Sequence, residues 1–284
     1  MTDDGLVVHL HEPLARWTPL RTGGACAAYV VALTEAGLVM ALKECRKTST
    51  KLTLLGASTR TVFRDADVPG VVLRLGGDLA HLGEWAPASA GPTLVTVGAG
   101  APVPALVALA ETHGWSGLEP FVATPGSVGA AVLFDDAWAE RVEAVGTIRR
   151  DKVVEDTLEA VRKRKTSVVV WVRLRLDAAD PARVARQTDA EWAKARPPAG
   201  SWYQPPRKST ARAVLRTVRL PLVRLRRVAI PEEAPECLVN LGGGTAADLA
   251  LLHRSAVDRV KSVRGLTLDA RLKWLGPKNK TARR

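Results

Sequence analysis

The stretch that most restricts the fold of this chain is residues 123–131, which read Ala-Thr-Pro-Gly-Ser-Val-Gly-Ala-Ala. Pro125 fixes its own φ angle and removes a backbone donor. Gly126 and Gly129 permit backbone conformations and close approaches that a Cβ would block. Because the side chains around them are small, a large flat or charged ligand can lie directly on the main chain, where exposed N–H groups suit a phosphate or a carbonyl-rich ring. The alternative is a tight turn between two apolar elements.

Around this turn the chain alternates between helix and strand patterns. Thr34 is placed to cap a helix that ends near Arg46, and strands over 51–55 and 71–75 follow, which predicts a small α/β unit over residues 14–76. Further along, the spacing of apolar residues predicts elements of both kinds. These are a strand over 93–97, a helix over 103–113, a hairpin over 142–157, a strand over 167–176, and helices over 180–195 and 245–263.

Composition bounds the class of protein. Hydrophobic residues make up 46% of the 284 residues, which permits two or three domains with sizeable cores and excludes global disorder. No apolar run reaches the roughly 18 residues that a membrane span needs, and the first four residues are acidic rather than signal-like, so we expect a cytoplasmic protein. Cys26, Cys45 and Cys237 lack metal-ligand spacing, which predicts no metal site and fits a reducing compartment.

A formal net charge of +12 favours anionic partners. The charge gathers in residues 207–227 and in the tail 278–284. The chain has only two Tyr and three Phe and no nucleic-acid-binding motif, so we expect no specific nucleic-acid partner. Anionic lipid, phosphorylated small molecules, an acidic partner for residues 207–227, and an abundance of Arg that serves no partner remain as the interpretations of this charge.

Motifs of one known family recur in the correct order over nearly the whole chain. They are residues 13–24, which resemble PLaxxTTLrvGG; residues 54–65, where the family has LGxGSNLLVxD; residues 114–119, which match GLSGLE; the turn at 123–131, which resembles GIPGTVGGA; residues 200–205, which resemble GSxFKNP; and residues 238–248, which resemble iVNxGgATAaDV. The chain thus resembles the bacterial UDP-N-acetylenolpyruvoylglucosamine reductases.

The resemblance implies an α+β fold. Its parts are an FAD-binding two-domain module of the vanillyl-alcohol-oxidase/PCMH type and a C-terminal α/β substrate-binding domain. On this chain we place the FAD-binding subdomains at 1–76 and 77–196, the substrate-binding domain at 197–276, and a basic tail at 277–284. The resemblance further implies FAD as the cofactor, NADPH as the reductant, a UDP-sugar substrate, a monomer, and a role in peptidoglycan precursor synthesis.

The residues implied to hold FAD come from two turns, and both depart from the family pattern. They are Gly56, Ala57, Ser58, Thr59, Arg60, Pro125, Gly126, Ser127 and Gly129. Ser58 replaces the second glycine of the first turn, Thr59 its serine and Arg60 its asparagine. A Cβ at position 58 would obstruct a close backbone approach if the φ angle there is positive. In the second turn Ala130 replaces a glycine, and the family's MNAG becomes 134–137, Phe-Asp-Asp-Ala.

The family's proton-donating serine matches Ser201. Its catalytic arginine, from the motif YRxS, matches Arg162 when the tyrosine is placed at Val161, whereas anchoring on Ser167 gives Arg164 or Lys165. These alternatives remain open.

The family's catalytic carboxylate falls, without a gap, on Arg271. Asp269 lies two residues away and would share a face with position 271 on a strand, so we take Asp269 as its candidate replacement. Tyr203 and Gln204 are the expected substrate-binding residues, with Gln204 in place of a lysine.

Two functions therefore compete. The order of the motifs, Ser201 and the Pro-Gly turn favour a divergent reductase. The family's motif SxxHaNF becomes Pro-Glu-Glu-Ala-Pro-Glu-Cys over 231–237, so its histidine is lost as well. The joint loss of the family's glutamate, asparagine, histidine and lysine favours a non-catalytic relative that binds a partner or acts as a scaffold. We take the reductase as the expectation.

Overall fold

The computed structural model describes residues 5–86, 91–164, 167–195, 202–203 and 209–277. The chain divides into two compact units. Unit 1 comprises Met1–Leu10, Ala28–Ala57 and Gly70–Pro197, and unit 2 comprises His11–Ala27, Ser58–Pro69 and Pro198–Arg284. Each unit has its own buried cluster of apolar side chains, so each has a core of the kind that defines a domain.

The first layer of unit 1 is a sheet in the order β1-β2-β5-β3, in which β3 is parallel to β5, together with helix α1. Its elements are β1 (Leu6–Pro13), β2 (Ala25–Ala32), α1 (Glu35–Lys47), β3 (Leu52–Leu55) and β5 (Val68–Leu75). Thr34 caps α1 because its side chain accepts a hydrogen bond from the N–H of Gly37. This confirms the cap that the sequence predicts.

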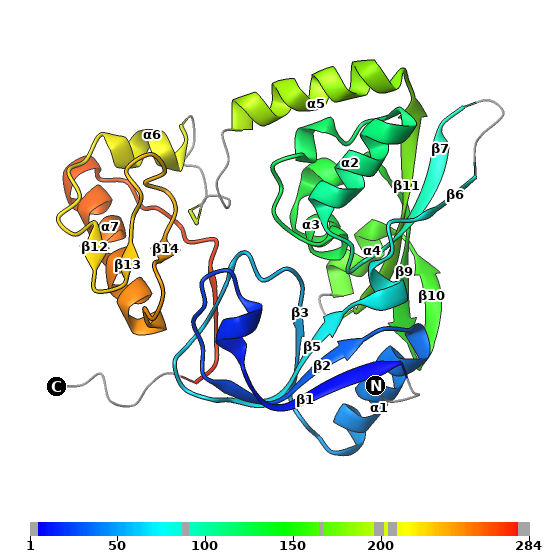
Figure 1. Ribbon diagram of the computed structural model, residues 1–284, viewed down its shortest axis with the longest axis horizontal. Helices are drawn as coiled ribbons and strands as arrows, with labels where there is room; N and C mark the ends of the chain where they lie inside the picture. The colour runs from blue at the N-terminus through cyan, green and yellow to red at the C-terminus, as the bar shows by residue number, and fades with distance from the viewer. Residues whose placement is uncertain (1–4, 87–90, 165–166, 196–201, 204–208, 278–284) are drawn as a thin grey trace. The chain divides into compact units, whose positions relative to one another are not determined.

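The second layer is an antiparallel sheet in the order β10-β9-β11-β7-β6, with β8 paired to β11. Figure 1 shows helices α2 and α3 on one side of this sheet, and α2 packs against α5. The elements are β6 (Glu84–Ala86), β7 (Thr93–Gly98), α2 (Val103–His113), β8 (Trp115–Ser116), α3 (Val128–Phe134), β9 (Val142–Arg149), β10 (Lys152–Asp156), α4 (Leu158–Arg164), β11 (Val169–Ala178) and α5 (Pro181–Ala195).

Strand β11 shows why the sheet is buried on one face only. Val172, Leu174 and Leu176 are fully buried, whereas Arg173 forms an ion pair with Glu155 of β10 and Arg175 forms one with Glu143 of β9. This alternation is the one that the sequence predicts for a strand with one wet face.

In its described residues, unit 2 combines short strands with helices α6 and α7. The strands β12, β13 and β14 form one antiparallel sheet, and β15 pairs with β4 in parallel. The elements are β4 (Thr61–Phe63), α6 (Ala211–Arg216), β12 (Arg224–Leu225), β13 (Val228–Ala229), β14 (Val239–Asn240), α7 (Ala246–Arg264) and β15 (Lys273–Leu275). Thr245 and Asp248 form the predicted capping box at the start of α7.

The mixture of antiparallel sheets, parallel pairs and packed helices confirms the α+β class. In the part of the chain that the structure describes, no helix is both long and apolar enough to cross a bilayer. The 3-10 turns are η1 (Leu14–Trp17), η2 (Gly77–Ala80), η3 (Glu119–Phe121) and η4 (Asp136–Trp138). The domain boundaries expected from the sequence stay a prediction.

Candidate functional site

The two turns expected to hold FAD meet in unit 1. Gly56 directly follows β3, and Ser127 is the residue that precedes α3. A Cβ built on Gly56 would lie 2.8 Å from Ser127 Oγ and 3.7 Å from the Cβ of Ala130. The two segments, more than 70 residues apart in the sequence, are therefore in direct contact, and only glycine fits at position 56 without a shift.

Gly126 and Gly129 serve this turn in different ways. Neither has a positive φ angle, so their conformation does not require glycine. A Cβ on Gly129 would lie 2.9 Å from the Cβ of Ala99, because α3 packs closely against the turn that follows β7. A Cβ on Gly126 would have no described heavy atom within 4 Å. Open space therefore lies directly against the main chain at Gly126, which is where a flat ligand can rest.

The expectation that the N–H groups of this turn are exposed is only partly right. The N–H of Val128 donates to the carbonyl of Ala101, and the N–H of Gly129 donates to the carbonyl of Ala99, both over 2.9 Å. These bonds anchor the first turn of α3, where N–H groups have no partner within the helix. Pro125 is half-buried beside them, and Phe134, at the far end of α3, is 81% exposed.

The remainder of the first turn belongs to unit 2 and explains how a serine replaces a glycine. Ser58 has a φ angle of 55°, the left-handed region that glycine adopts most easily. Its buried hydroxyl donates a hydrogen bond of 2.9 Å to the carbonyl of Trp17, which offsets part of the strain. Thr59 and Arg60 are half-buried, and Ala57 is half-buried in unit 1.

Substitutions of Ser58 separate strain from hydrogen bonding. Ser58→Ala loses the bond to Trp17 and keeps the left-handed backbone, so we expect a loss of about 1–2 kcal/mol in the free energy of unfolding. Ser58→Gly loses the same bond but relieves about 1 kcal/mol of strain, so it should be the milder change. Urea unfolding of both variants checks this, and equal losses would contradict the strain at this position.

Arg162, the first candidate for the catalytic arginine, caps helix α3. Its Nε and Nη2 donate to the carbonyl of Val132 at 3.1 and 2.7 Å, Nη2 also donates to the carbonyl of Asp135 at 2.8 Å, and Nη1 pairs with the carboxylate of Asp136 at 2.8 Å. Carbonyls at the end of a helix have no partner within it. Arg162 therefore fixes the C-terminal end of the helix that begins at the FAD turn, and its catalytic assignment stays a prediction.

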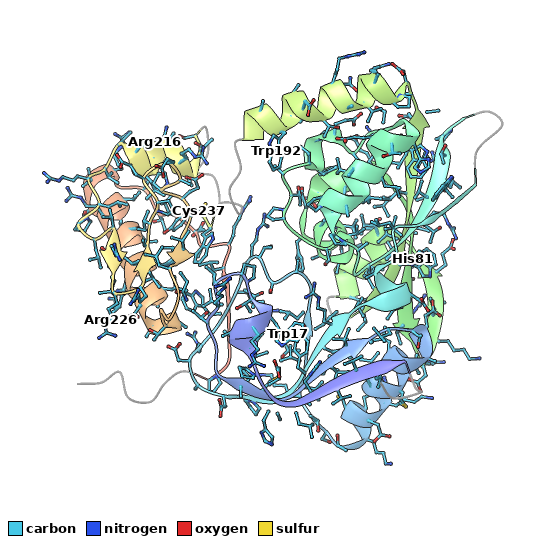
Figure 2. All side chains as sticks on the ribbon, in the orientation of Figure 1. Trp17, His81, Trp192, Arg216, Arg226 and Cys237 are labelled. Atoms are coloured by element: carbon cyan, nitrogen blue, oxygen red, sulfur yellow. The ribbon has the colours of Figure 1, made fainter. Side chains whose placement is uncertain are left out.

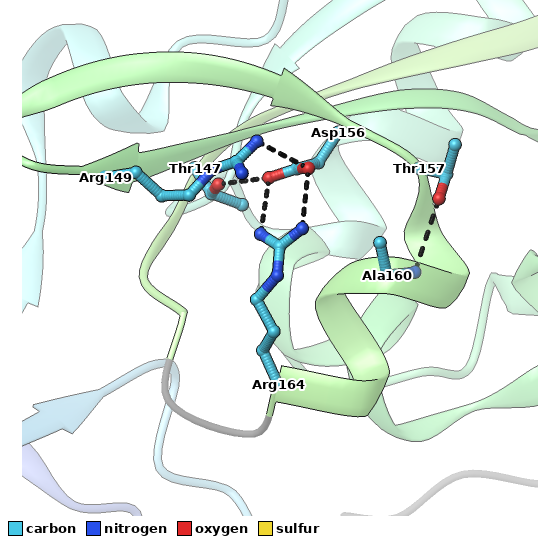
Figure 3. A network of polar contacts seen from close by, with 6 residues as sticks. All are labelled: Thr147, Arg149, Asp156, Thr157, Ala160 and Arg164. Carbon is cyan, nitrogen blue, oxygen red and sulfur yellow. Dashed lines mark hydrogen bonds and ion pairs between the residues drawn. The ribbon is translucent and has the colours of Figure 1, made fainter.

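Arg164, the second candidate, belongs to a polar network around Asp156 (Figure 3). Its Nη1 and Nη2 pair with the two carboxylate oxygens at 2.9 and 3.0 Å, while Arg149 and the hydroxyl of Thr147 each contribute a further contact of 2.8 Å. These residues come from β9, β10 and α4, so the network ties α4 to the sheet. Lys165, the third candidate, lies outside the described residues.

This network around Asp156 makes the free energy of unfolding depend on pH. The pKa of Asp156 is lowered from 3.8 to about 2, mainly by the hydrogen bond from Arg164. The hydrogen bond from Thr147 and the positive charge of Arg149 lower it further, whereas burial of the carboxylate acts to raise it. Because the folded pKa is the lower one, the stabilisation is complete above pH of about 4 and is lost as the pH falls towards 2.

Asp156→Asn should therefore be less stable than the wild type at neutral pH, with a difference that shrinks between about pH 4 and pH 2. Urea unfolding across this range measures the two curves. Arg173→Gln, which removes an exposed pair with Glu155, is the control and should show a far smaller difference at neutral pH. Parallel curves for wild type and Asp156→Asn would contradict the role of the carboxylate.

The segment expected to carry the proton donor is held in unit 2 by backbone contacts. Ser201 and Gln204 lie outside the described residues, whereas Trp202 and Tyr203 are 1% exposed. The N–H of Trp202 donates to the carbonyl of Glu236 at 3.1 Å, and the N–H of Arg271 donates to the carbonyl of Trp202 at 2.8 Å. Three segments distant in sequence thus meet at the residue that follows Ser201.

Tyr203 is packed inside the core of unit 2. Its ring stacks on that of His253 of α7, with centroids 5.3 Å apart and planes inclined by 12°, and its backbone forms a bridge with Ala270. Burial, and then the neighbouring thiol of Cys237, hold the pKa of Tyr203 well above its ordinary value. The ring is thus placed as a structural anchor, and its assignment to substrate binding stays a prediction.

Asp269 and Arg271 stand in less regular structure than expected. The strand on which positions 269 and 271 would share a face is not formed, because residues 269–271 contribute only the bridge at Ala270 and β15 begins at Lys273. Asp269 is exposed and Arg271 is half-buried. The proposal that Asp269 replaces the family carboxylate stays a prediction.

The basic segment 207–227 is divided between core and surface. Arg212 of α6 pairs with the buried carboxylate of Glu236, with a hydrogen bond of 2.7 Å from its Nε. Arg216 and Arg226 are exposed, and Figure 2 shows them on α6 and on the β12–β13 hairpin. Arg207 and Lys208 lie outside the described residues.

Two residues outside the predicted site organise unit 2. The carboxylate of Asp65 accepts hydrogen bonds from the N–H groups of Ala246 (2.7 Å) and Ala247 (3.0 Å), which stabilises the N-terminus of α7. The side chain of Asn240 accepts from the N–H groups of Gly242 and Gly244 and donates to the carbonyl of Leu20. Both residues could have been identified from the sequence, because Asp65 lies in segment 54–65 and Asn240 in segment 238–248, and both segments resemble family motifs.

Comparison with known proteins fits this geometry. The profile of the FAD binding domain family matches residues 26–162. UDP-N-acetylenolpyruvoylglucosamine reductase of Geobacter metallireducens is 30% identical over 93% of this chain and 93% of that protein, and that of Deinococcus radiodurans is 31% identical over 87% and 90%. The crystal structure of the Thermus caldophilus reductase covers 95% of this chain and 99% of its own, with a TM-score of 0.76 at 24% identity, and supports the fold.

The residues of the two converging turns fit FAD, because bare main chain at Gly126 adjoins the close contact of Gly56 with Ser127. The two relatives match most of the chain rather than single motifs, and the FAD binding domain matches residues 26–162, which include both turns. The chain belongs to the UDP-N-acetylenolpyruvoylglucosamine reductase family.

Proposed function

We propose that this chain is an FAD-dependent enzyme that reduces UDP-N-acetylglucosamine enolpyruvate to UDP-N-acetylmuramate, with NADPH as the reductant, in peptidoglycan precursor synthesis. The observation that carries the proposal is the meeting of Gly56 and Ser127 beside open main chain at Gly126. The relatives that match over most of their length are named for the reduction of this substrate.

The reaction adds two hydrogen atoms across a carbon–carbon double bond. FAD, when bound, supplies the hydride that it has accepted from NADPH. The hydride adds to the terminal carbon of the enolpyruvyl group, the electron pair of the double bond moves toward the carboxylate, and a proton adds to the adjacent carbon. Ser201 is the proposed donor of this proton, and it needs a nearby positive charge because a hydroxyl is a weak acid.

The distribution of charge supports an anionic substrate for unit 2. This unit has 22 Lys and Arg against 9 Asp and Glu, a net charge of +13, whereas unit 1 has 19 against 20, a net charge of −1. The two values sum to the +12 of the chain. A basic unit raises the local concentration of a diphosphate sugar and speeds its association.

The test begins with the absorption spectrum of the purified protein. We expect a yellow protein with bound flavin, which oxidises NADPH only when the enolpyruvyl substrate is added. A colourless protein that takes up no added FAD would contradict the proposal. A protein that binds FAD and the UDP-sugar but shows no turnover would instead support the non-catalytic binding or scaffolding role, which the cap formed by Arg162 favours.

A further inference from the structure

The proposed reduction needs a cation near the substrate carboxylate, and the expected arginines are occupied in unit 1. Negative charge moves onto this carboxylate when hydride adds to the double bond, so a fixed positive charge lowers the barrier. Arg162 directs its guanidinium to the carbonyls and the carboxylate at the end of α3. Arg164 holds both oxygens of Asp156. Either guanidinium would have to give up these bonds to meet a substrate.

Arg271 is differently placed. Its N–H donates to the carbonyl of Trp202 at 2.8 Å, and the preceding Ala270 forms a bridge with Tyr203. The backbone of Arg271 is therefore fixed beside the residue that follows Ser201 in the sequence. All of these residues belong to unit 2, so the placement holds within one compact unit.

The guanidinium of Arg271 is available for a ligand. The side chain is half-buried, and it forms no hydrogen bond or ion pair with any residue in the described part of the chain. Asp269, two residues away, is exposed and does not pair with it. A half-buried cation is partly desolvated, so an anion that reaches it gains more than it would at an open surface.

We propose that Arg271 binds the carboxylate of the enolpyruvyl group and stabilises the charge that develops there during hydride addition. The inference rests on the proposed function and deepens it, because it names the group of this chain that recognises the substrate carboxylate. A guanidinium presents a planar pair of N–H donors that matches both oxygens of a carboxylate. At this position the family motif has a carboxylate, so the chain supplies a positive charge from the segment in which the motif supplies a negative one.

Binding of two nucleotide sugars to the full-length protein tests this assignment without turnover. UDP-N-acetylglucosamine enolpyruvate carries the carboxylate, and UDP-N-acetylglucosamine lacks it. By calorimetry, the wild type should bind the first more tightly than the second. Arg271→Met should reduce this preference by about 10- to 100-fold, the effect of losing a charge-assisted pair of hydrogen bonds. Arg271→Lys, which keeps the charge but not the planar fork, should retain part of it.

Lys273→Met is the matched control, because Lys273 is an exposed cation two residues further along the same segment. It should keep the preference of the wild type. If Arg271→Met has a normal circular-dichroism spectrum and thermal midpoint, its reduced preference for the carboxylate-bearing sugar is not caused by unfolding.

The assignment is overturned if Arg271→Met keeps the preference, or if Lys273→Met loses it equally. It is also overturned if Arg271→Glu, which restores the residue type of the family motif, binds the carboxylate-bearing sugar more tightly than the wild type. A wild-type protein that binds neither sugar overturns the proposed function, and this assignment with it.

Discussion

Replacing Gly126 by leucine should weaken FAD binding at least about 10- to 100-fold and leave the stability of the protein unchanged. A Cβ at this position meets no described atom within 4 Å, so the side chain of a leucine starts in open space. The φ angle of Gly126 is not positive, so leucine adopts the backbone without strain. The side chain would instead fill the space in which we place the flavin, and overlap of this kind costs about 1–3 kcal/mol or more.

The matched control is Gly129→Leu. Its Cβ would meet the Cβ and the carbonyl oxygen of Ala99 at 2.9 and 3.1 Å, so this variant should lose about 1–3 kcal/mol of stability. Flavin fluorescence titration gives the FAD affinity, and thermal unfolding gives the stability. If Gly126→Leu binds FAD as tightly as the wild type, the flavin does not lie at this turn.

Truncating Arg212 to alanine should lower the free energy of unfolding by about 3–5 kcal/mol, the largest effect on stability that we expect. The side chain of Glu236 is only 8% exposed, and its Oε2 has no hydrogen-bond partner in the described residues, so the pair with Arg212 is what compensates its charge. Without Arg212 the carboxylate stays buried and uncompensated. Because the carbonyl of Glu236 accepts from the N–H of Trp202, the loss should also loosen the segment that follows Ser201.

Arg216→Ala, on the same helix, is the control for this experiment. Arg216 is exposed and donates one weak hydrogen bond of 3.3 Å to the carbonyl of Glu233, so its loss should change stability by less than about 0.5 kcal/mol. The double variant Arg212→Met/Glu236→Leu should recover most of the stability, because it removes the charge together with its partner. Urea unfolding compares all three. Similar effects for Arg212→Ala and Arg216→Ala would contradict the buried pair.

Patterns that depend on neighbouring residues were predicted well. The helix over 103–113 has these bounds in the structure because Pro102 precedes it and Gly114, with a φ angle of 67°, ends it. The capping box of α7 needs only Thr245 and Asp248, three residues apart. The alternation of β11 needs only a sheet with one buried face. In contrast, residues 158–164 form helix α4, although the sequence analysis predicted no element over them.

The roles of single residues at the site were decided by contacts between distant segments. A Cβ at Gly56 would displace the hydroxyl of Ser127, and glycine is required at 129 because the Cβ and the carbonyl oxygen of Ala99 lie against it. Arg162 resembles a catalytic arginine in the sequence, yet its hydrogen bonds go to residues about 30 positions earlier. Asp65 caps a helix that begins 181 residues later.

The amino-acid sequence by itself determined the family, the α+β class, and the places of the main helices and strands, because periodicity, caps and turn residues act over a few positions. The tertiary structure decided which charged side chains form ion pairs and hydrogen bonds within the protein and which are available to bind a ligand. A side chain pairs with whatever the folded chain brings within about 3 Å of it, and spacing along the sequence does not contain that distance.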